Sequence, residues 1–277
     1  MIKLIVCDFD GTILNRETQS IGTRIAEALK KAQEKGIQFA CATGRNAPAA
    51  AEILSKTNTR GWMIDLNGAE LTSPDGECVY QNGFKRALIE RYFDKMIHPD
   101  ILTSFYCPGM KYTLLPLEEH YRRYFTIPAC GKTPQTFSYE QFCKTYTSVK
   151  SVDEIPDPVF KIEMRTADLS VLAQIRQNLT GLEGLDLTSA FSNNLEVMPA
   201  GCNKASTLKI LAEKLGIENE QIAVFGDDLN DLCLFEEFEN SYAVANAKPE
   251  ILERAAHVIG NCESQAAADI ILSFTEE

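Results

Sequence analysis

Short apolar segments recur along this chain, and each is followed by a polar turn and then by a segment with helical periodicity. Residues 2–6, 37–42, 62–66 and 222–226 are such segments, and the first is interrupted only by Lys3. Strands that alternate with helices form βαβ units, whose strands lie parallel in a sheet that helices cover. The sequence therefore predicts the α/β fold class, with a doubly wound, Rossmann-like parallel sheet.

The first helix is expected soon after the first of these strands. Ile25 and Leu29 lie on its apolar face, Ser20 is expected as its N-cap, and Gly36 is expected to end it. Strand, loop and helix therefore form the opening unit.

The pattern changes in the middle of the chain, where helix-like and strand-like segments are mixed. The helix-like segments are residues 84–97, 118–125 and 169–179, and the strand-like ones are residues 104–108, 111–116 and 159–165. This composition predicts an α+β domain inserted at residues 83–188.

The alternating pattern is expected to return at Ser189. The segment 191–199 is followed by a helix that ends at Gly216, and further short strands follow it. We therefore expect a core domain whose first part is residues 1–82 and whose second part is residues 189–277.

Charge and cysteine usage limit the classes of partner. The formal net charge is −12, and the basic residues are scattered rather than clustered. A nucleic acid or an anionic membrane surface is therefore disfavoured as a partner. The 9 cysteines are odd in number and form no C-x-x-C pair, which is typical of reduced thiols, and no apolar run approaches membrane-spanning length. We expect a cytoplasmic protein.

Polar residues follow the predicted parallel strands at four places. They are Asp8 with Asp10, the segment 43–45, the segment around Lys204, and residues 226–231. In a doubly wound sheet, ligands bind at the carboxyl ends of the strands. These segments are therefore the candidate functional residues.

Carboxylates from two of these segments are expected to converge. Asp8 and Asp10 alone could form a solvated turn, but Asp227, Asp228 and Asp231 follow another strand of the same apolar type. Several carboxylates facing one crevice repel one another, and a bound divalent cation relieves that repulsion. Oxygen ligands without His or Cys indicate a hard ion, and the expected cofactor is Mg²⁺.

A magnesium ion beside aspartates is an arrangement suited to phosphoryl transfer. Asp8 would attack phosphorus and form an aspartyl phosphate, and Asp10 would protonate the leaving alkoxide and later deprotonate the attacking water. Thr43 would donate a hydrogen bond to the phosphate, and Lys204 would place a fixed positive charge beside it.

The segments DFDGT (8–12), TGR (43–45), the Lys204 segment and GDDLND (226–231), in this order, resemble the haloacid dehalogenase superfamily. The position and texture of the insert are similar to those of its Cof-type subgroup, also called IIB, which carries a C2B cap. This resemblance covers the whole chain. It implies a phosphomonoester hydrolase with a Rossmann-like core and a cap domain.

The resemblance also assigns individual positions. Asp10 is implied as a metal ligand through its backbone carbonyl, Asp227 as the third magnesium ligand, and Arg45 as a residue near the substrate or the cap. The expected metal ligands are Asp8, Asp10, Asp227 and Asp231. The expected substrate- and phosphate-binding residues are Phe9, Thr43, Gly44, Arg45, Lys204 and Asn230.

Two loops depart from the pattern of this subgroup. The segment 241–251 is two residues shorter than in many relatives, and the segment 263–272 lacks their usual Gly-Val. Both loops are expected to differ in shape.

Taken singly, the motifs have simpler interpretations. Residues 43–45 could be a helix-entry turn, Lys204 a surface charge, and Asp228 and Asp231 helix-capping acids. The aromatic residues of the segment 118–125 could form either a substrate-facing surface or part of the insert's core.

The expected activity is magnesium-dependent hydrolysis of a small phosphorylated metabolite, such as a sugar phosphate, by a monomer or homodimer. A sugar phosphomutase with the same nucleophile is one alternative. A metabolite-binding regulator that has lost turnover is another.

Overall fold

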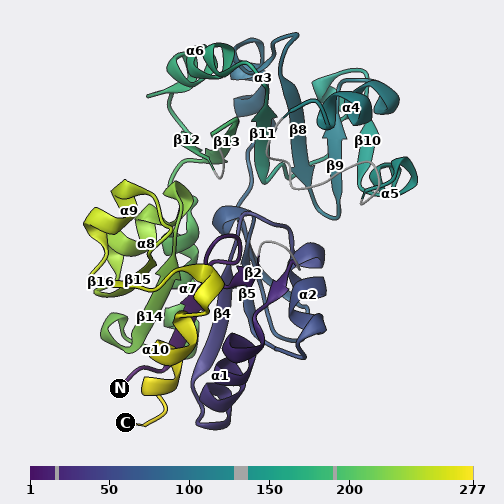
Figure 1. The fold of residues 1–277 in the computed structure, drawn as a ribbon. Coiled ribbons are helices and arrows are strands. Elements are labelled where there is room, and N and C mark those ends of the chain that lie inside the picture. Colours follow the sequence, from purple (N-terminus) through teal and green to yellow (C-terminus); the bar gives the residue numbers. More distant parts are fainter. Residues whose placement is uncertain (16–18, 128–136, 190–191, 277) are drawn as a thin grey trace. The chain divides into compact units, whose positions relative to one another are not determined.

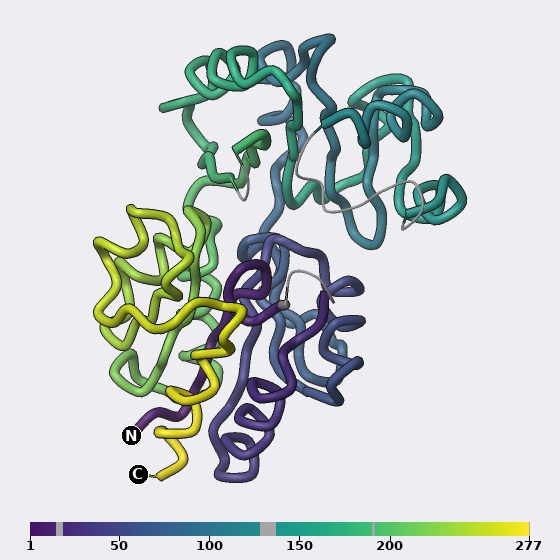
Figure 2. The backbone as a smooth tube through the Cα atoms, viewed as in Figure 1, coloured from purple at the N-terminus to yellow at the C-terminus, as the bar shows by residue number. Residues whose placement is uncertain are grey.

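The chain forms two compact units in a computed structural model, which describes residues 1–15, 19–127, 137–189 and 192–276. The first unit contains Met1–Gln81 and Cys202–Glu277, and the second contains Asn82–Gly201 (Figure 1). The chain leaves the first unit once and returns to it once, as the tube in Figure 2 shows. An inserted domain within a core is the arrangement that the sequence suggested.

An eight-stranded sheet forms the centre of the first unit. Its order is β16-β15-β14-β1-β4-β5-β6-β7, and the strands from β16 to β5 run parallel. The pair β6 and β7 adds an antiparallel hairpin at one edge. The bounds are β1 Leu4–Cys7, β4 Gln38–Ala42, β5 Trp62–Asp65, β6 Glu70–Thr72, β7 Cys78–Gln81, β14 Ile222–Gly226, β15 Asn240–Val244 and β16 His257–Ile259.

Helices cover both faces of this sheet. Along β1, Ile5 and Cys7 pack with α1, α2 and α10 on one face, whereas Leu4 and Val6 pack with α7, α8 and α9 on the other. Because both faces are buried, the strands are continuously apolar rather than alternating. The predicted doubly wound sheet is confirmed. The helices are α1 Thr23–Glu34, α2 Ala47–Lys56, α7 Lys204–Leu215, α8 Leu232–Glu237, α9 Pro249–Arg254 and α10 Ala267–Ser273.

The start of α1 differs from the expected one. Ser20 and Ile21 form β3 (Ser20–Ile21), which pairs with β2 (Leu14–Asn15), and the N-cap position is Gly22. The expectation that Ser20 caps the helix is therefore wrong, because that residue is taken up in a short hairpin.

The second unit has its own six-stranded sheet, in the order β10-β9-β8-β11-β13-β12. All neighbours are antiparallel except β9 and β10. The apolar side of this sheet packs on α3 and α6, in a core separate from those of the first unit. The bounds are α3 Arg86–Met96, β8 Leu102–Cys107, β9 Met110–Thr113, α4 Leu117–Tyr124, α5 Tyr139–Cys143, β10 Tyr146–Ser148, β11 Lys161–Arg165, α6 Leu169–Leu179, β12 Leu185–Thr188 and β13 Asn194–Pro199.

The aromatic residues of α4 pack mainly within this unit. The Tyr121 ring contacts the rings of Phe125, Tyr139 and Phe142 edge to face. These contacts favour the interpretation of α4 as part of the insert's core.

The division between the units lies later in the chain than the expected boundary at residues 188 and 189. β13 pairs with β11 and β12, so it belongs to the sheet of the second unit. The second unit consequently extends to Gly201. The expectation that the segment 191–199 returns to the core is wrong, because this strand is apolar but hydrogen-bonds to the inserted sheet.

No helix among the residues that the structure describes is long and apolar enough to span a membrane.

Candidate active site

Three of the predicted segments meet at the carboxyl edge of the first unit's sheet. Asp8 follows β1, Thr43 follows β4, and Asp227 follows β14. β1 lies between β4 and β14, with Cys7 in register with a residue on each side, and the backbone N–H of Asp8 donates to the carbonyl of Phe225 at 2.9 Å. The three strand ends therefore lie side by side, as the sequence predicted.

Lys204 reaches this edge from the first position of α7. Its side chain has no exposed surface, and its Nζ donates to Asp8 Oδ1 at 2.7 Å and to Asp231 Oδ1 at 2.6 Å. The Asn203 side chain caps α7 by accepting the N–H of Ser206, which fixes the helix start. Lys204 is therefore a buried bridge between two carboxylates and not a surface charge.

Burial and neighbouring charges shift the ionisation of this cluster. Burial lowers the pKa of Lys204, but the carboxylates of Asp231 and Asp8 outweigh it and raise the pKa above its ordinary value. Burial raises the pKa of Asp8, Lys204 lowers it, and Asp231 and Asp227 raise it again. Burial, with the charge of Asp231, also raises the pKa of Asp227 to about 7. Burial and mutual repulsion therefore oppose ionisation of these carboxylates, and Lys204 offsets this only in part.

The carboxylates of this cluster fit a divalent cation. Asp8, Asp227 and Asp231 each offer an oxygen atom, and these atoms lie within 4.8 Å of one another. Three buried carboxylates face one buried ammonium, so a further cation would stabilise them. An oxygen-only ligand set is the kind that Mg²⁺ prefers.

Hydrogen bonds hold the two later aspartates in place. Asp231 Oδ2 accepts the backbone N–H groups of Asp227 and Asp228, while its Oδ1 accepts from Lys204. Thr12 Oγ1 donates to Asp227 Oδ1 at 2.7 Å. Asp231 therefore already accepts three hydrogen bonds from the protein, which suits a positioning group.

Gly11 allows the first loop to approach Asp227. A Cβ atom on Gly11 would lie 2.2 Å from Asp227 Oδ2, and the residue has a φ of +91°. Both the space and the backbone conformation therefore require glycine here.

Asp10 is not part of the buried cluster. Its carboxylate accepts two hydrogen bonds from Arg45, from Nε at 2.7 Å and from Nη2 at 2.6 Å, and its side chain is 41% exposed. Arg45 Nη2 also donates to Gln19 Oε1 at 2.9 Å. The predicted acid/base thus forms a two-point ion pair with a residue that the sequence placed near the substrate.

The remaining predicted residues lie around this edge in different environments. Thr43 is fully buried, and its hydroxyl oxygen accepts the backbone N–H of Arg45 at 3.1 Å. Asn230 Nδ2 donates to Asn67 Oδ1 at 3.1 Å, and a Cβ on Gly44 would lie 3.0 Å from the same oxygen. The Phe9 side chain is buried in the hydrophobic core, so only its backbone could contact a phosphate.

Sequence reasoning missed three residues that support the site. Thr12 stands in the DFDGT motif without an assigned role, although its hydroxyl holds Asp227. Asn67, just after β5, adopts a left-handed conformation with a φ of 60°, and its Oδ1 accepts from Asn230. Asn246 Nδ2 donates to the carbonyl of Gly11 at 2.8 Å.

Asn246, in the segment 241–251, contacts the residue just before the segment 263–272. Its Oδ1 accepts the backbone N–H of Cys262 at 2.8 Å, while its amide supports the loop after β1. Asn246 therefore links the segment 241–251 to the loop that carries Asp8.

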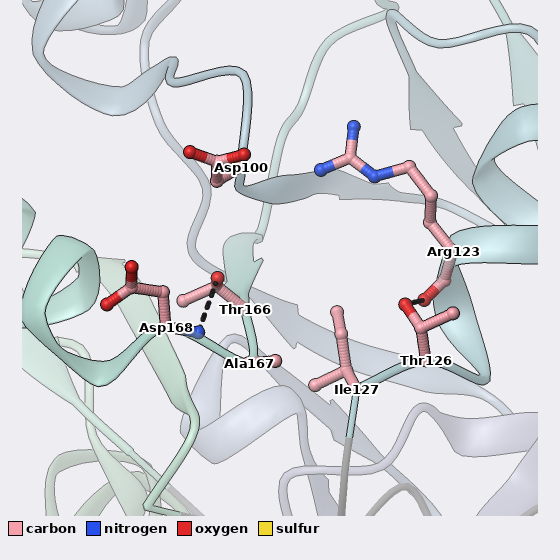
Figure 3. A pocket seen from close by; sticks show the side chains of 7 residues that line it. All are labelled: Asp100, Arg123, Thr126, Ile127, Thr166, Ala167 and Asp168. Atoms are coloured by element: carbon pink, nitrogen blue, oxygen red, sulfur yellow. Dashed lines mark hydrogen bonds between the residues drawn. The ribbon is translucent and has the colours of Figure 1, made fainter.

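A cavity of about 380 Å³ lies elsewhere, entirely within the second unit. Figure 3 shows Arg123 and Asp100 on its rim, with Thr166 and Asp168 opposite them. It contains none of the predicted site residues. We place the candidate site by the charge cluster and not by this cavity, because the cluster contains the groups that can carry out chemistry.

Known proteins similar to this chain cover its whole length. The family model of haloacid dehalogenase-like hydrolases matches residues 5–271. The chain is 26% identical over 257 residues to the 5-amino-6-(5-phospho-D-ribitylamino)uracil phosphatase of Bacillus subtilis, which spans 93% of this chain and 89% of that protein. It is also 26% identical over 299 residues to the HMP-PP phosphatase of Cronobacter sakazakii, spanning 100% of this chain and 97% of that protein.

Solved structures share the fold. A haloacid dehalogenase-like hydrolase from B. subtilis superposes with a TM-score of 0.83 at 23% identity, over 98% of this chain and 99% of that one. A subclass IIB sugar phosphatase superposes with a TM-score of 0.77 at 17% identity, over 98% of each chain.

Proposed function

This chain belongs to the family of haloacid dehalogenase-like hydrolases, and we propose that it is a magnesium-dependent phosphatase that acts through an aspartyl phosphate on Asp8. Family membership confirms the resemblance that the four sequence motifs indicated. The observation that supports the proposal most is the buried bridge from Lys204 to Asp8 and Asp231, because it fixes a carboxylate where a phosphate could be attacked.

The proposed substrate is a small phosphorylated metabolite such as a sugar phosphate. Two relatives of similar length are named as phosphatases of a phosphorylated ribitylaminouracil and of HMP-PP. Their names support the substrate class and leave the individual substrate to be found by screening.

Asp8 would act as the nucleophile. One of its carboxylate oxygens attacks phosphorus, the bond from phosphorus to the leaving oxygen breaks, and an acyl phosphate remains on Asp8. Lys204, fixed at 2.7 Å from Asp8 Oδ1, orients this carboxylate and stabilises the added negative charge. Water then cleaves the acyl phosphate at phosphorus and regenerates Asp8.

Asp10 would transfer protons at the exposed side of the same loop. It donates a proton to the leaving oxygen and then accepts one from the attacking water. The ion pair with Arg45 corresponds to the ionised state that serves as the base. As an acid, Asp10 must hold a proton, and in that state its pairing with Arg45 is weakened.

A bound Mg²⁺ would neutralise phosphate charge during the attack. Asp8, Asp227 and the backbone carbonyl of Asp10 are the proposed ligands. Asp231 was expected as a ligand too, but we propose that it instead positions Lys204 and the loop of Asp227, because its oxygens accept three hydrogen bonds within the protein.

Phosphate release from p-nitrophenyl phosphate tests the proposed function. We expect turnover with Mg²⁺, and a loss of turnover with EDTA or in the variant Asp8→Asn. The variant Asp75→Asn, in the turn of the exposed hairpin between β6 and β7, is the matched control and should keep full activity. Equal rates in wild type, Asp8→Asn and EDTA-treated protein would contradict the proposal. A requirement for a sugar bisphosphate would instead identify a phosphomutase.

A further inference from the structure

Strand β11 carries three charged side chains on one face of the second unit's sheet, and all three are buried. Lys161, Glu163 and Arg165 alternate with Ile162 and Met164, which pack in the apolar core on the other face. Charged residues at alternate positions of a strand normally face solvent. Here Arg165 is only 6% exposed, so the charged face of β11 needs partners.

Lys161 and Glu163 have such partners. Lys161 Nζ donates to Glu196 Oε1 at 2.6 Å, and Glu163 Oε2 accepts the hydroxyl of Tyr106 at 2.9 Å. Burial opposes ionisation of Glu163, but Arg165 and the neighbouring lysines hold its pKa below the usual value. These two side chains are thus accounted for within the protein.

Arg165 is not satisfied in the same way. Its guanidinium lies 4.9 Å from the centre of the Tyr124 ring. Its Nε and Nη2 atoms are buried, and neither finds a hydrogen-bond acceptor in the part of the chain that the structure describes. Burying unpaired donors of a cation is costly, and such groups are rare unless a ligand or water completes them.

The two unsatisfied atoms form one edge of the guanidinium group. Through Nε and Nη2, an arginine can donate two parallel hydrogen bonds to both oxygens of a carboxylate or phosphate. Arg45 uses this same edge to hold the two carboxylate oxygens of Asp10 at 2.7 Å and 2.6 Å. The corresponding edge of Arg165 donates to no carboxylate of the described chain.

The surrounding charges favour an anion. Lys111 lies 4.3 Å from the centre of the Tyr106 ring on the same face. Among the described residues of β8, β9, β11 and β13, this face carries three cations and two carboxylates. The cations are Lys111, Lys161 and Arg165, and the carboxylates are Glu163 and Glu196. The additional negative charge of a bound anion would balance this cluster, in which only Lys111 is partly exposed.

We propose that the Nε and Nη2 edge of Arg165 binds an oxyanion that presents two acceptor oxygens, namely a carboxylate or a phosphate group. The second unit therefore contains an anion-binding site of its own, and this site is independent of the proposed function, because every group involved belongs to that unit.

Malonate is the probe for binding, because it carries carboxylates and no phosphoryl group. Titration calorimetry of the full-length protein should show saturable binding in roughly the millimolar range. Arg165→Met should abolish this binding. Arg91→Met is the matched control, since Arg91 lies in α3 of the same unit with its side chain 59% exposed, and it should bind malonate as wild type does.

The variant Arg165→Lys keeps the charge but lacks the two-point edge, so it tests the geometry if Arg165→Met fails to fold. The Nε–H resonance of Arg165 in the wild-type protein gives a second measurement, and it should shift on addition of malonate. An unshifted resonance and no binding at roughly 10 mM malonate would overturn the inference, as would equal binding by folded Arg165→Met. If p-nitrophenyl phosphate is not hydrolysed, the proposed function fails, and the malonate titration still decides whether Arg165 binds an anion.

Discussion

At the scale of single residues, Lys204 is the group on which the candidate site depends most. It is completely buried and bridges Asp8 and Asp231, so removing it leaves two carboxylates without their ammonium. We predict that Lys204→Met lowers turnover roughly a hundredfold or more, the scale of one preorganised charge contact. Its stability should fall by about 3 kcal/mol, because breaking a buried pair leaves uncompensated charge.

Lys209→Met is the matched control for this variant. Lys209 lies on the same helix, α7, but its side chain is 47% exposed and pairs with Glu237 at the surface. Its loss should leave the steady-state rate unchanged. Equal rates for the two variants would remove Lys204 from the site.

Asp65 gives a second prediction at this scale, because it is a buried carboxylate at the end of β5. Its Oδ2 accepts from Thr72 at 3.1 Å, but its Oδ1 has no hydrogen-bond partner within the described residues. Burial raises the pKa of Asp65 to about 7 from a usual value near 3.8. The folded protein therefore binds more protons than the unfolded chain in this window, so this residue's contribution to stability is lost as the pH rises toward 7.

Asp65→Asn should stabilise the first unit by roughly 2 kcal/mol at pH 8, because the amide stays uncharged when buried. The single tryptophan, Trp62, lies on the same strand and reports unfolding of this unit by its fluorescence. The gain should vanish near pH 4. A gain that does not depend on pH would refute this account of Asp65.

The candidate residues that the sequence identified were those following apolar strands. Asp8, Thr43 and Asp227 could be found because parallel strands place their carboxyl ends at one edge. The pairing of Asp10 with Arg45 could not be found, because both were expected to face the substrate and their mutual distance depends on two loops. Asn67 was missed because a left-handed backbone conformation at a non-glycine residue has no reliable local signature.

At the scale of elements, the N-terminus of α7 positions Lys204, the proposed catalytic lysine. Asn203 caps this helix through hydrogen bonds in both directions with Ser206. We predict that Asn203→Ala costs about 1 kcal/mol in the free energy of unfolding and also lowers kcat, because Lys204 is the next residue. Urea unfolding and steady-state kinetics measure the two effects.

Asn219→Ala is a suitable comparison for this variant. Asn219 lies in an exposed turn before β14, away from the cluster, so its substitution should change neither quantity by much. A loss of stability in Asn203→Ala with unchanged kcat would show that the cap does not position Lys204.

His120 makes α4 sensitive to acid. Burial lowers its pKa to about 4, and its ring Nδ1 lies 2.8 Å from the hydroxyl of Thr113. The unfolded chain therefore binds a proton below about pH 6.5 that the folded unit binds only near pH 4. The stability of the second unit should fall as the pH decreases through this window, by up to about 3 kcal/mol.

Hydrogen exchange of α4 between pH 7 and pH 4.5, corrected for intrinsic rates, measures this loss of stability. His120→Gln should make protection of α4 less dependent on pH, because the amide does not titrate. The exposed His98 gives the control His98→Gln, which should retain the dependence. A dependence that survives in His120→Gln would assign it to other groups.

Element types were predictable from the sequence, but sheet membership was not. The apolar periods identified α3, α6 and β11 within the insert and β4, β5 and β14 in the core. β13 has the same apolar character as a core strand, yet it hydrogen-bonds to β11. The pairing partner of β13 depends on contacts between residues distant in sequence. The expected boundary between the inserted domain and the core therefore came too early in the chain.

At the scale of the whole molecule, the chain builds two units with separate cores. The strands of the first unit are buried on both faces, whereas the sheet of the second has one apolar and one charged face. The first unit supplies all the residues proposed for chemistry, and the second supplies the Arg165 cluster. The domain order, the fold class and the family could be predicted from the sequence. The buried charges of the second unit could not, because charged residues at alternate positions of a strand normally indicate a solvent-exposed face.

The stereochemical course at phosphorus tests the covalent role of Asp8 most directly. Hydrolysis of a phosphate ester made chiral with oxygen isotopes distinguishes two displacements from one, whatever the lifetime of the intermediate. Attack by Asp8 followed by attack of water inverts phosphorus twice, so we predict net retention of configuration. Net inversion would show that water attacks the substrate directly, and would contradict the aspartyl phosphate.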